Sequence, residues 1–378
     1  MRSRIKSGTG EPQTILFRAH IRFGYAQNMQ TRRHFLTQAA ALATLGTPAM
    51  AAMPQEFYVP AEEARHAFTL MQWPVDRYAY NSARDLEEVQ AVIARIANTI
   101  AAFEPVVMLA DQAQHSTARP ALSERVELWN IATDDLWCRD SGPLFVVNDA
   151  GDLAISHIQF NGWGRYDLPN DAQIAALVAE HMGLPHYDAG LVGEPGGAEA
   201  DGRGLVMAHE SSWINANRNP GLSKDEITDR LAAAYGADRV IWGPGVKGRD
   251  VTDAHIDGFA RFTPGGTVLM QHDTTAPDDP YNRATATLMQ TLKSENLHVE
   301  TIPYAFDGRI DEVCYYVNYY VCNGAVIMSE FGDPEPDAIA LEAVRRHYPD
   351  HEVVTLNADR LIGLGGGIHC ATQQVPAV

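Results

Sequence analysis

Residues 363–376, close to the end of the 378-residue chain, read Gly-Leu-Gly-Gly-Gly-Ile-His-Cys-Ala-Thr-Gln-Gln-Val-Pro. The three consecutive glycines allow backbone conformations that are closed to other residues, and they let a ligand approach the main chain closely. Gly367 ends this run, the thiol of Cys370 follows, and polar Thr372 and Gln373 come next. This order favours a positioned nucleophile at Cys370, with Gly367 beside the substrate, over a buried structural cysteine after a flexible turn.

A thiol nucleophile needs a proton acceptor or shuttle and groups that hold the electrophile. Residues 250–257, which read Asp-Val-Thr-Asp-Ala-His-Ile-Asp, offer both. Residues two apart share a face in an extended segment, so we expect His255 and Asp257 to point into one site with Asp253 beside them. His-x-Asp is also a common metal-ligand pair, but no further histidine cluster accompanies it. An imidazole next to a carboxylate is therefore favoured over a metal site.

A third cluster, at 137–143, reads Trp-Cys-Arg-Asp-Ser-Gly-Pro. On local sequence alone, Asp140 could cap the Ser-Gly-Pro turn, and Arg139 could be its ion-pair partner. A carboxylate at a strand end is also suited to accept paired hydrogen bonds from a planar guanidinium, whose donors form a fork. Asp140 and Asp257 would then hold opposite edges of such a cation.

Two other segments are dense in turn formers and aromatic residues, namely Phe-Asn-Gly-Trp-Gly-Arg-Tyr at 160–166 and Asn-Arg-Asn-Pro at 217–220. Taken singly, such segments are more often architectural than catalytic. The sequence therefore assigns them no chemistry.

Taken together, these segments resemble the agmatine deiminase and bacterial peptidylarginine deiminase family, part of the guanidine-modifying superfamily with the pentein fold. The match runs in order through five motifs, at 137–143, 160–166, 217–220, 255–257 and 365–376. The resemblance implies an α/β fold, a single-domain five-bladed α/β propeller, that works without cofactor or metal. It also implies roles for five side chains: Cys370 as nucleophile, His255 as general acid/base, Asp140 and Asp257 as guanidinium clamps, and Trp137 lining the site.

The chain departs from the family pattern at residues 194–199, which read Glu-Pro-Gly-Gly-Ala-Glu where Glu-Gly-Gly is usual. The acid that flanks the catalytic histidine is therefore Glu194 or Glu199, and Glu194 is favoured. Glu63 also stands where an agmatine deiminase is expected to have an aromatic residue.

The resemblance implies hydrolysis of agmatine to N-carbamoylputrescine and ammonia, a reaction of putrescine biosynthesis and polyamine metabolism. An exported peptidylarginine deiminase, which converts arginine in peptides to citrulline, is the first alternative. An amidinotransferase and a non-catalytic guanidinium-binding protein are further alternatives. The formal net charge of -19 agrees with a small cationic substrate and disfavours nucleic acid and anionic membrane surfaces as partners. Assembly into a homo-oligomer stays open.

The first 53 residues differ from the rest in charge, since Glu11 is their only acid and their Arg and Lys side chains dominate. Residues 31–36 read Thr-Arg-Arg-His-Phe-Leu and precede a short apolar run at 39–45 and small residues at 49–51. This order predicts a twin-arginine signal that engages the twin-arginine export machinery, with cleavage near Ala51 or Ala52 and a periplasmic or secreted product. The apolar run is too short for stable membrane insertion.

We therefore expect a signal region at 1–53 and a guanidine-deiminase catalytic domain at 54–378. Met29 lies directly before the signal and offers an alternative start, which would make residues 1–28 an overlong start. The four cysteines suggest disulfides in an exported protein, but twin-arginine substrates fold before export in a reducing compartment, so pairing stays open. No C-x-x-C occurs, so the cysteines do not indicate zinc.

Strand-like and helix-like segments alternate along the catalytic region, which predicts an α/β protein. The expected strands are rich in Val, Ile, Leu and aromatic residues and lie at 106–110, 144–147, 205–207, 240–242, 267–270, 315–322 and 325–328. The expected amphipathic helices lie at 85–103, 171–182, 224–235, 281–294 and 337–346. No internal repeat is visible in the sequence.

Overall fold

A computed structural model of the chain describes residues 51–75, 80, 82–272, 276–305 and 314–378. Residues Met50–Val378 form one compact unit, separate from Met1–Ala49. The twin-arginine motif expected at 31–36 lies outside the described residues, as does the apolar run after it. In the part of the chain that the structure describes, no helix has the length and apolar character needed to cross a membrane.

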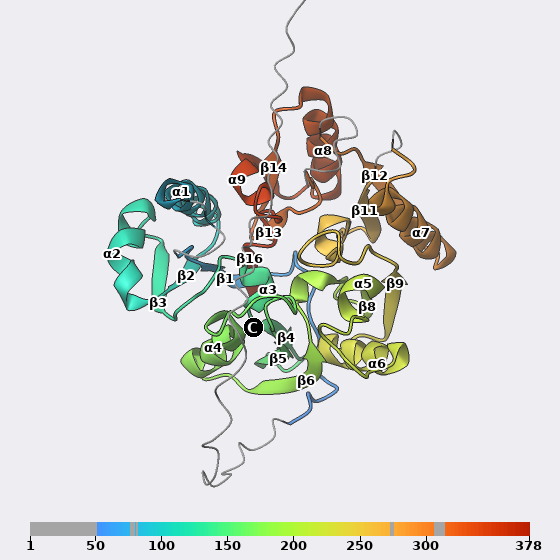
Figure 1. The fold of residues 1–378 in the computed structure, drawn as a ribbon, viewed down its shortest axis with the longest axis horizontal. Helices are drawn as coiled ribbons and strands as arrows, with labels where there is room; N and C mark the ends of the chain where they lie inside the picture. The colour runs from blue at the N-terminus through green and yellow to red at the C-terminus, as the bar shows by residue number, and fades with distance from the viewer. Residues whose placement is uncertain (1–50, 76–79, 81, 273–275, 306–313) are drawn as a thin grey trace, which may run out of the picture. The chain divides into compact units, whose positions relative to one another are not determined.

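Five small sheets make up the compact unit, and one pattern of strand pairing recurs in them. An antiparallel pair of strands is followed by a helix, which leads to a further strand parallel to the second. The same pattern forms the sheets β10-β11-β12 and β13-β14-β15. Figure 1 shows the sheets arranged around a common centre, which is the five-bladed α/β propeller that the resemblance implies.

Four of the sheets have three strands each. Their strands are β4 (Leu144–Val147), β5 (Leu153–Gln159), β6 (His186–Val192), β7 (Ala198–Ala200), β8 (Leu205–His209), β9 (Arg239–Gly243), β10 (Ala260–Phe262), β11 (Thr267–Gln271), β12 (His298–Ile302), β13 (Tyr320–Cys322), β14 (Ala325–Glu330) and β15 (Glu352–Asn357). The crossover helices are α4 (Ile174–Met182), α6 (Lys224–Tyr235), α7 (Pro280–Ser294) and α8 (Pro334–His347).

The remaining sheet joins the two ends of the unit. Its order is β16-β1-β2-β3, with β1 (His66–Gln72) antiparallel to β16 (Thr372–Pro376). Helix α1 (Ala83–Ile100) leads from β1 to the parallel strand β2 (Val106–Ala110), and β2 pairs in parallel with β3 (Val126–Asn130). The last strand, β16, closes the ring by pairing with the first strand, β1. The loop that carries Cys370 directly precedes β16, so this pairing fixes the position of the loop.

Short helical turns complete the connections. The α-helical ones are α2 (His115–Ala118), α3 (Cys138–Ser141), α5 (Glu210–Trp213) and α9 (Asp359–Ile362). The 3-10 turns are η1 (Gln112–Gln114), η2 (Arg119–Ala121), η3 (Asp171–Gln173), η4 (Pro195–Gly197) and η5 (Ile256–Gly258).

Local sequence explains most of these elements. Helix α6 begins with a capping box, in which Ser223 and Glu226 satisfy each other's backbone N–H groups, and it ends at Gly236 in the left-handed conformation. Helix α1 buries Val92, Ile96 and Ile100 at helical spacing against the first sheet. Strand β2 is buried throughout, as expected for a strand with parallel neighbours on both sides.

Three expectations need correction. The strand expected at 315–322 is confined to Tyr320–Cys322, and the helix expected at 171–182 begins as the 3-10 turn η3. Residues 250–257 are not extended: they form turns that end in η5. Asp250 and Asp253 accept backbone N–H groups within this loop and fold it back on itself, and Arg218, 35 residues away in sequence, holds Asp253.

Candidate active site

Five segments that directly precede β4, β7, β10, β13 and β16 contact one another, and we call them the leading segments. They carry, in that order, Asp140, Glu194, the pair His255 and Asp257, Asn318, and Cys370. Backbone hydrogen bonds join three of them: Arg139 N donates to Cys370 O at 3.0 Å, and His369 N donates to Asn318 O at 3.1 Å. Since each leading segment occupies the same place in its sheet, the repeated fold brings together at least one polar or ionisable side chain from each sheet.

His255 is buried between two carboxylates from other leading segments. Its Nε2 lies 3.0 Å from Glu194 Oε2, and its Nδ1 lies 3.4 Å from Asp140 Oδ1. Burial alone would lower the pKa of His255, but the attraction of Asp140 and Glu194 raises it to about 10. The imidazole is therefore positively charged at neutral pH in the ligand-free protein.

Glu194, and not Glu199, is the acid beside His255. Glu199 instead binds Arg261, whose Nε lies 2.8 Å from Glu199 Oε1. Pro195 begins the turn η4, and Glu194 stands directly before it, beside His255. Gly196 must lack a side chain because Asp140 and His255 lie against it. A Cβ at Gly196 would lie 2.5 Å from Asp140 Oδ1 and 3.1 Å from His255 Nδ1.

Asp140 neither pairs with Arg139 nor merely caps a turn. Its Oδ2 accepts a hydrogen bond from Trp163 Nε1 at 2.8 Å, and its buried Oδ1 has no hydrogen-bond partner. Arg139 binds Gln374 and Glu62 instead, at 2.7 and 3.3 Å. This oxygen lies 3.4 Å from His255 Nδ1 but accepts no hydrogen bond there, so it can accept one from a bound molecule.

The carboxylate of Asp257 does not face His255, which corrects the expectation that the two share one face. Its Oδ2 lies 2.7 Å from His369 Nδ1 and 3.5 Å from the thiol of Cys370. The two side chains diverge because they stand on the turn η5 rather than on a strand. Burial raises the pKa of Asp257, but His369, and more weakly His255, bring it below its ordinary value. Asp257 is therefore ionised beside the thiol.

Cys370 is partly exposed, and its thiol lies among polar groups. Asn318 Nδ2 donates to its Sγ at 3.2 Å. Burial raises the pKa of this thiol well above its ordinary value, and the negative charges of Asp257 and Asp140 raise it further. The thiol is therefore protonated in the ligand-free protein, and a cation bound between the carboxylates would reverse the effect.

Two further predicted residues line the same place. The ring of Trp137 covers Gly366, where a Cβ would lie 2.5 Å from the indole. A Cβ at Gly367 would lie 2.5 Å from Asn318 Oδ1, the atom that accepts His369 N at 3.1 Å. Gly367 is therefore required for the loop before Cys370 to approach Asn318.

Sequence reasoning missed four side chains that contact this site. Trp163 binds Asp140, and Arg218 binds Glu194, although both segments were interpreted as architectural. His369 binds Asp257, yet its motif gave it no role, and Asn318 lies in a segment that was expected to be a strand. The one feature of the sequence that could have indicated these residues was the unusual density of turn formers and aromatic residues in the segments of Trp163 and Arg218.

The metal alternative for His255 and Asp257 finds no support in their geometry, because the two side chains have different partners. Among residues 51–378, apart from the four gaps in their description, no group of three or more His, Cys, Asp or Glu side chains is arranged to hold a metal ion. Cys138, Cys322 and Cys370 carry free thiols.

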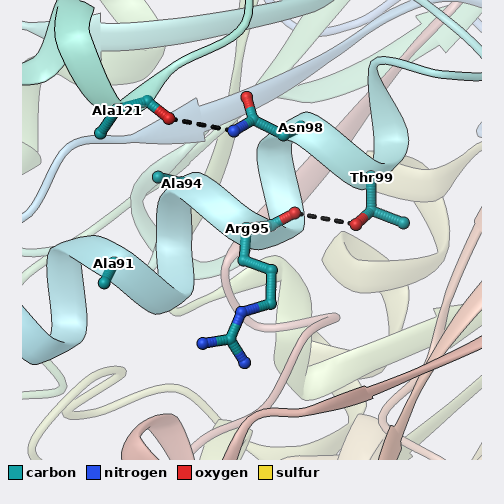
Figure 2. Close-up of a pocket in the computed structure, with 6 residues that line it drawn as sticks. All are labelled: Ala91, Ala94, Arg95, Asn98, Thr99 and Ala121. Atoms are coloured by element: carbon teal, nitrogen blue, oxygen red, sulfur yellow. Dashed lines mark hydrogen bonds between the residues drawn. The ribbon is translucent and has the colours of Figure 1, made fainter.

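A hollow of about 460 Å³ lies elsewhere, along the outer face of α1. Its lining residues are Ala91, Ala94, Arg95, Asn98, Thr99 and Ala121 (Figure 2). Asn98 Nδ2 donates to Ala121 O at 3.0 Å and Thr99 Oγ1 donates to Arg95 O at 2.9 Å, so these polar groups hold the local fold. None of the leading segments contributes to this hollow.

Comparison with known proteins adds three findings. The family model described as Porphyromonas-type peptidyl-arginine deiminase matches residues 58–376. The agmatine deiminases of Stutzerimonas stutzeri and Medicago truncatula are 34% and 33% identical to this chain, each over 85% of it and over 96% and 97% of their own lengths. The solved agmatine deiminase of Enterococcus faecalis superposes with a TM-score of 0.79 at 27% identity, covering 86% of this chain and 98% of its own.

Proposed function

Since the chain belongs to the Porphyromonas-type peptidyl-arginine deiminase family, we propose that it hydrolyses the guanidinium group of agmatine, giving N-carbamoylputrescine and ammonia. We favour agmatine over peptidyl arginine because this chain matches two proteins named agmatine deiminases over nearly their whole lengths, at 34% and 33% identity. The enzyme class is hydrolase of C–N bonds in linear amidines. Its product is a direct precursor of putrescine, which favours a place in putrescine formation.

One observation carries the proposal: the charges of two buried carboxylates act on the thiol of Cys370, and one of these carboxylates has an oxygen that accepts no hydrogen bond within the described residues. Asp140 Oδ1 accepts no hydrogen bond and lies 3.4 Å from His255 Nδ1, and Asp257 Oδ2 lies 3.5 Å from Cys370 Sγ. A planar guanidinium presents donors along its edges, so it can bind both carboxylates while its central carbon faces the sulfur. In our proposal, Asp140 and Asp257 hold the substrate in this way, and Trp137 and Gly367 line the site.

Binding of the cation activates the nucleophile. The negative charges of Asp257 and Asp140 oppose ionisation of Cys370 in the ligand-free protein. The guanidinium neutralises that field, so the thiol gives up its proton to solvent and the thiolate adds to the guanidinium carbon. The addition product is a neutral tetrahedral species, because the negative sulfur has joined a positive carbon centre.

His255 then moves the protons. The imidazolium donates its proton to one amino group, which leaves as ammonia and gives a cationic amidino-thioether on Cys370. The neutral imidazole next takes a proton from a water molecule as that water adds to the same carbon. Collapse of the second tetrahedral species breaks the C–S bond and releases the ureido product, and the proton of its hydroxyl group passes to the departing sulfur, which regenerates the thiol. Glu194 stabilises the charged form of His255 throughout, since its Oε2 lies 3.0 Å from Nε2.

The test is a comparison of substrates with the purified protein. Agmatine, free arginine and an arginine-containing peptide are each incubated with it, and ureido product and ammonia are measured. We expect both products from agmatine without any amine acceptor, which also separates hydrolysis from amidino transfer. Citrulline from the peptide, with no product from agmatine, would refute the choice of substrate and favour peptidylarginine deimination.

We also propose that the chain is exported by the twin-arginine route to the periplasm or beyond. The support is the order of residues at 31–36, 39–45 and 49–51, which lie largely outside the described residues. A cationic substrate in that compartment would meet a strongly negative protein, which favours its capture.

A further inference from the structure

Arg218 belongs to the Asn-Arg-Asn-Pro segment, which the proposed reaction does not use. Its side chain is 1% exposed and lies between two buried carboxylates. Nε donates to both oxygens of Glu194 at 2.9 and 2.8 Å, and Nη1 donates to Asp253 Oδ2 at 2.9 Å. Nη2 donates to the carbonyl of Thr252 at 3.1 Å. One guanidinium therefore joins the acid beside His255 to the turn that precedes His255.

That turn has an unusual backbone. Asp253 and Ala254 both lie in the left-handed region, with φ of 60° and 67°. A Cβ makes this conformation unfavourable, so it persists only where surrounding contacts enforce it. The contacts are at hand: besides Arg218, the Asp253 carboxylate accepts from Arg165 Nη2 at 2.8 Å and from Gly248 N at 2.7 Å. Because His255 is the next residue, these contacts set the direction in which its side chain leaves the backbone.

Arg218 also controls the charges around His255. Asp140 and Glu194 contact this imidazole directly, and Asp257 and His209 lie close enough to interact with its charge. Burial raises the pKa of Glu194, and the attraction of Arg218 is the largest effect that lowers it. Without that cation, the pKa of Glu194 would rise, and its side chain would no longer be held against the imidazole.

We infer that Arg218 is a positioning residue for the reaction, which holds Glu194 ionised against His255 and fixes the left-handed turn that directs the imidazole. This inference rests on the proposed function, in which His255 donates and accepts the protons.

The first test needs no substrate. The charge state of His255 is followed by an NMR pH titration of the ligand-free, full-length protein in the wild type and in Arg218→Met. We expect the midpoint of the variant to fall by about one pH unit or more, because Glu194 is no longer held 3.0 Å from Nε2 and stabilises the imidazolium less. Arg165→Met is the matched comparison: Arg165 binds the other oxygen of Asp253 but has no bond to Glu194 in the structure, so its midpoint should fall less than that of Arg218→Met.

The second test is turnover of agmatine as a function of pH. Arg218→Met should lower kcat on the order of 10- to 100-fold with little change in KM, because the imidazole is misdirected while the carboxylate clamps remain. The alkaline limb of kcat should move to lower pH, a change that mere loss of folded protein would not produce. Arg218→Lys keeps the charge but cannot bind both carboxylates at once, so part of the activity should return.

Two results would overturn the inference. One is an Arg218→Met protein with an unshifted His255 midpoint and an unshifted alkaline limb. The other is an Arg218→Lys protein with wild-type kcat and pH profile, which remains decisive if Arg218→Met fails to fold. Failure of the proposed function looks different: the wild type itself would then release no ammonia from agmatine, and the role of Arg218 in the reaction would fall with it.

Discussion

Replacement of Asp257 by Asn tests the guanidinium clamp most directly. In the ligand-free protein this carboxylate is 2% exposed, binds His369 at 2.7 Å and lies 3.5 Å from the thiol of Cys370. The variant keeps an oxygen that can accept from His369 but loses the negative charge. A charge-assisted pair with a guanidinium in a desolvated pocket contributes about 3 kcal/mol. We therefore expect kcat/KM for agmatine to fall on the order of 150-fold.

The same substitution should have the opposite effect on the thiol. The charge of Asp257 helps to raise the pKa of Cys370, so its removal lowers that pKa and increases the thiolate fraction near neutral pH. Alkylation by a neutral reagent such as iodoacetamide should become faster in Asp257→Asn while agmatine turnover becomes slower. Faster alkylation of Cys370 together with slower turnover of agmatine is the result that distinguishes a guanidinium clamp from the other roles.

The assay combines agmatine turnover, the rate of Cys370 alkylation followed by mass spectrometry, and the melting temperature. Asp201→Asn is the matched control, because Asp201 is a buried carboxylate that binds Arg203 and Leu205 away from the leading segments. It should lower the melting temperature without changing activity per folded molecule. If Asp257→Asn retains wild-type kcat/KM, the clamp is refuted. If its alkylation slows together with turnover, Asp257 acts as a base for the thiol instead.

Four other predictions address the nucleophile, the acid, pH and export. Cys370→Ser should abolish turnover with little change in melting temperature, and a haloacetamidine should add mass to Cys370 and to no other cysteine; substantial residual activity would remove the nucleophile role. Glu194→Gln should cost at least about tenfold in kcat and move its alkaline limb to lower pH, whereas Glu199→Gln should mainly lower the melting temperature, since Glu199 binds Arg261. The pKa of His255 is raised from 6.5 to about 10, so its contribution to stability is complete below pH 6.5 and is lost as the pH rises toward 10. The melting temperatures of the wild type and His255→Gln should therefore converge over that interval. A constant difference between them would contradict the positive charge assigned to His255. Replacement of Arg32 and Arg33 together by Lys should leave an unprocessed precursor in the cytoplasm, and a shortened periplasmic product would argue against twin-arginine export.

Local sequence was sufficient for most of the secondary structure. The strands at Val106–Ala110 and Leu144–Val147 begin and end where their apolar runs do, and helix α6 spans Lys224–Tyr235 as its capping residue predicts. These elements depend on side-chain periodicity and on capping within a few residues, which a sequence displays directly. The fivefold repeat was not visible, because each sheet requires only the same pattern of pairing and not the same residues.

The sequence motifs likewise supplied the candidate site residues, and the structure brings these candidates together. Cys370, His255, Asp140 and Glu194 all lie in leading segments that contact one another, as do Asp257, Trp137 and Gly367. What the motifs could not give is which of these groups faces which.

Those pairings were decided by the tertiary structure. Asp257 stands two residues from His255, yet its partner His369 is 112 residues away, and Glu194 lies 61 residues from the imidazole that it stabilises. Neighbours in sequence diverged because Asp253 folds their segment into a turn, and Asp253 is held by Arg218 from another sheet's connection. Sequence alone thus specified the chemical groups through local pattern, whereas the charge state and direction of each group depend on burial and on partners that only closure of the five-sheet ring brings together.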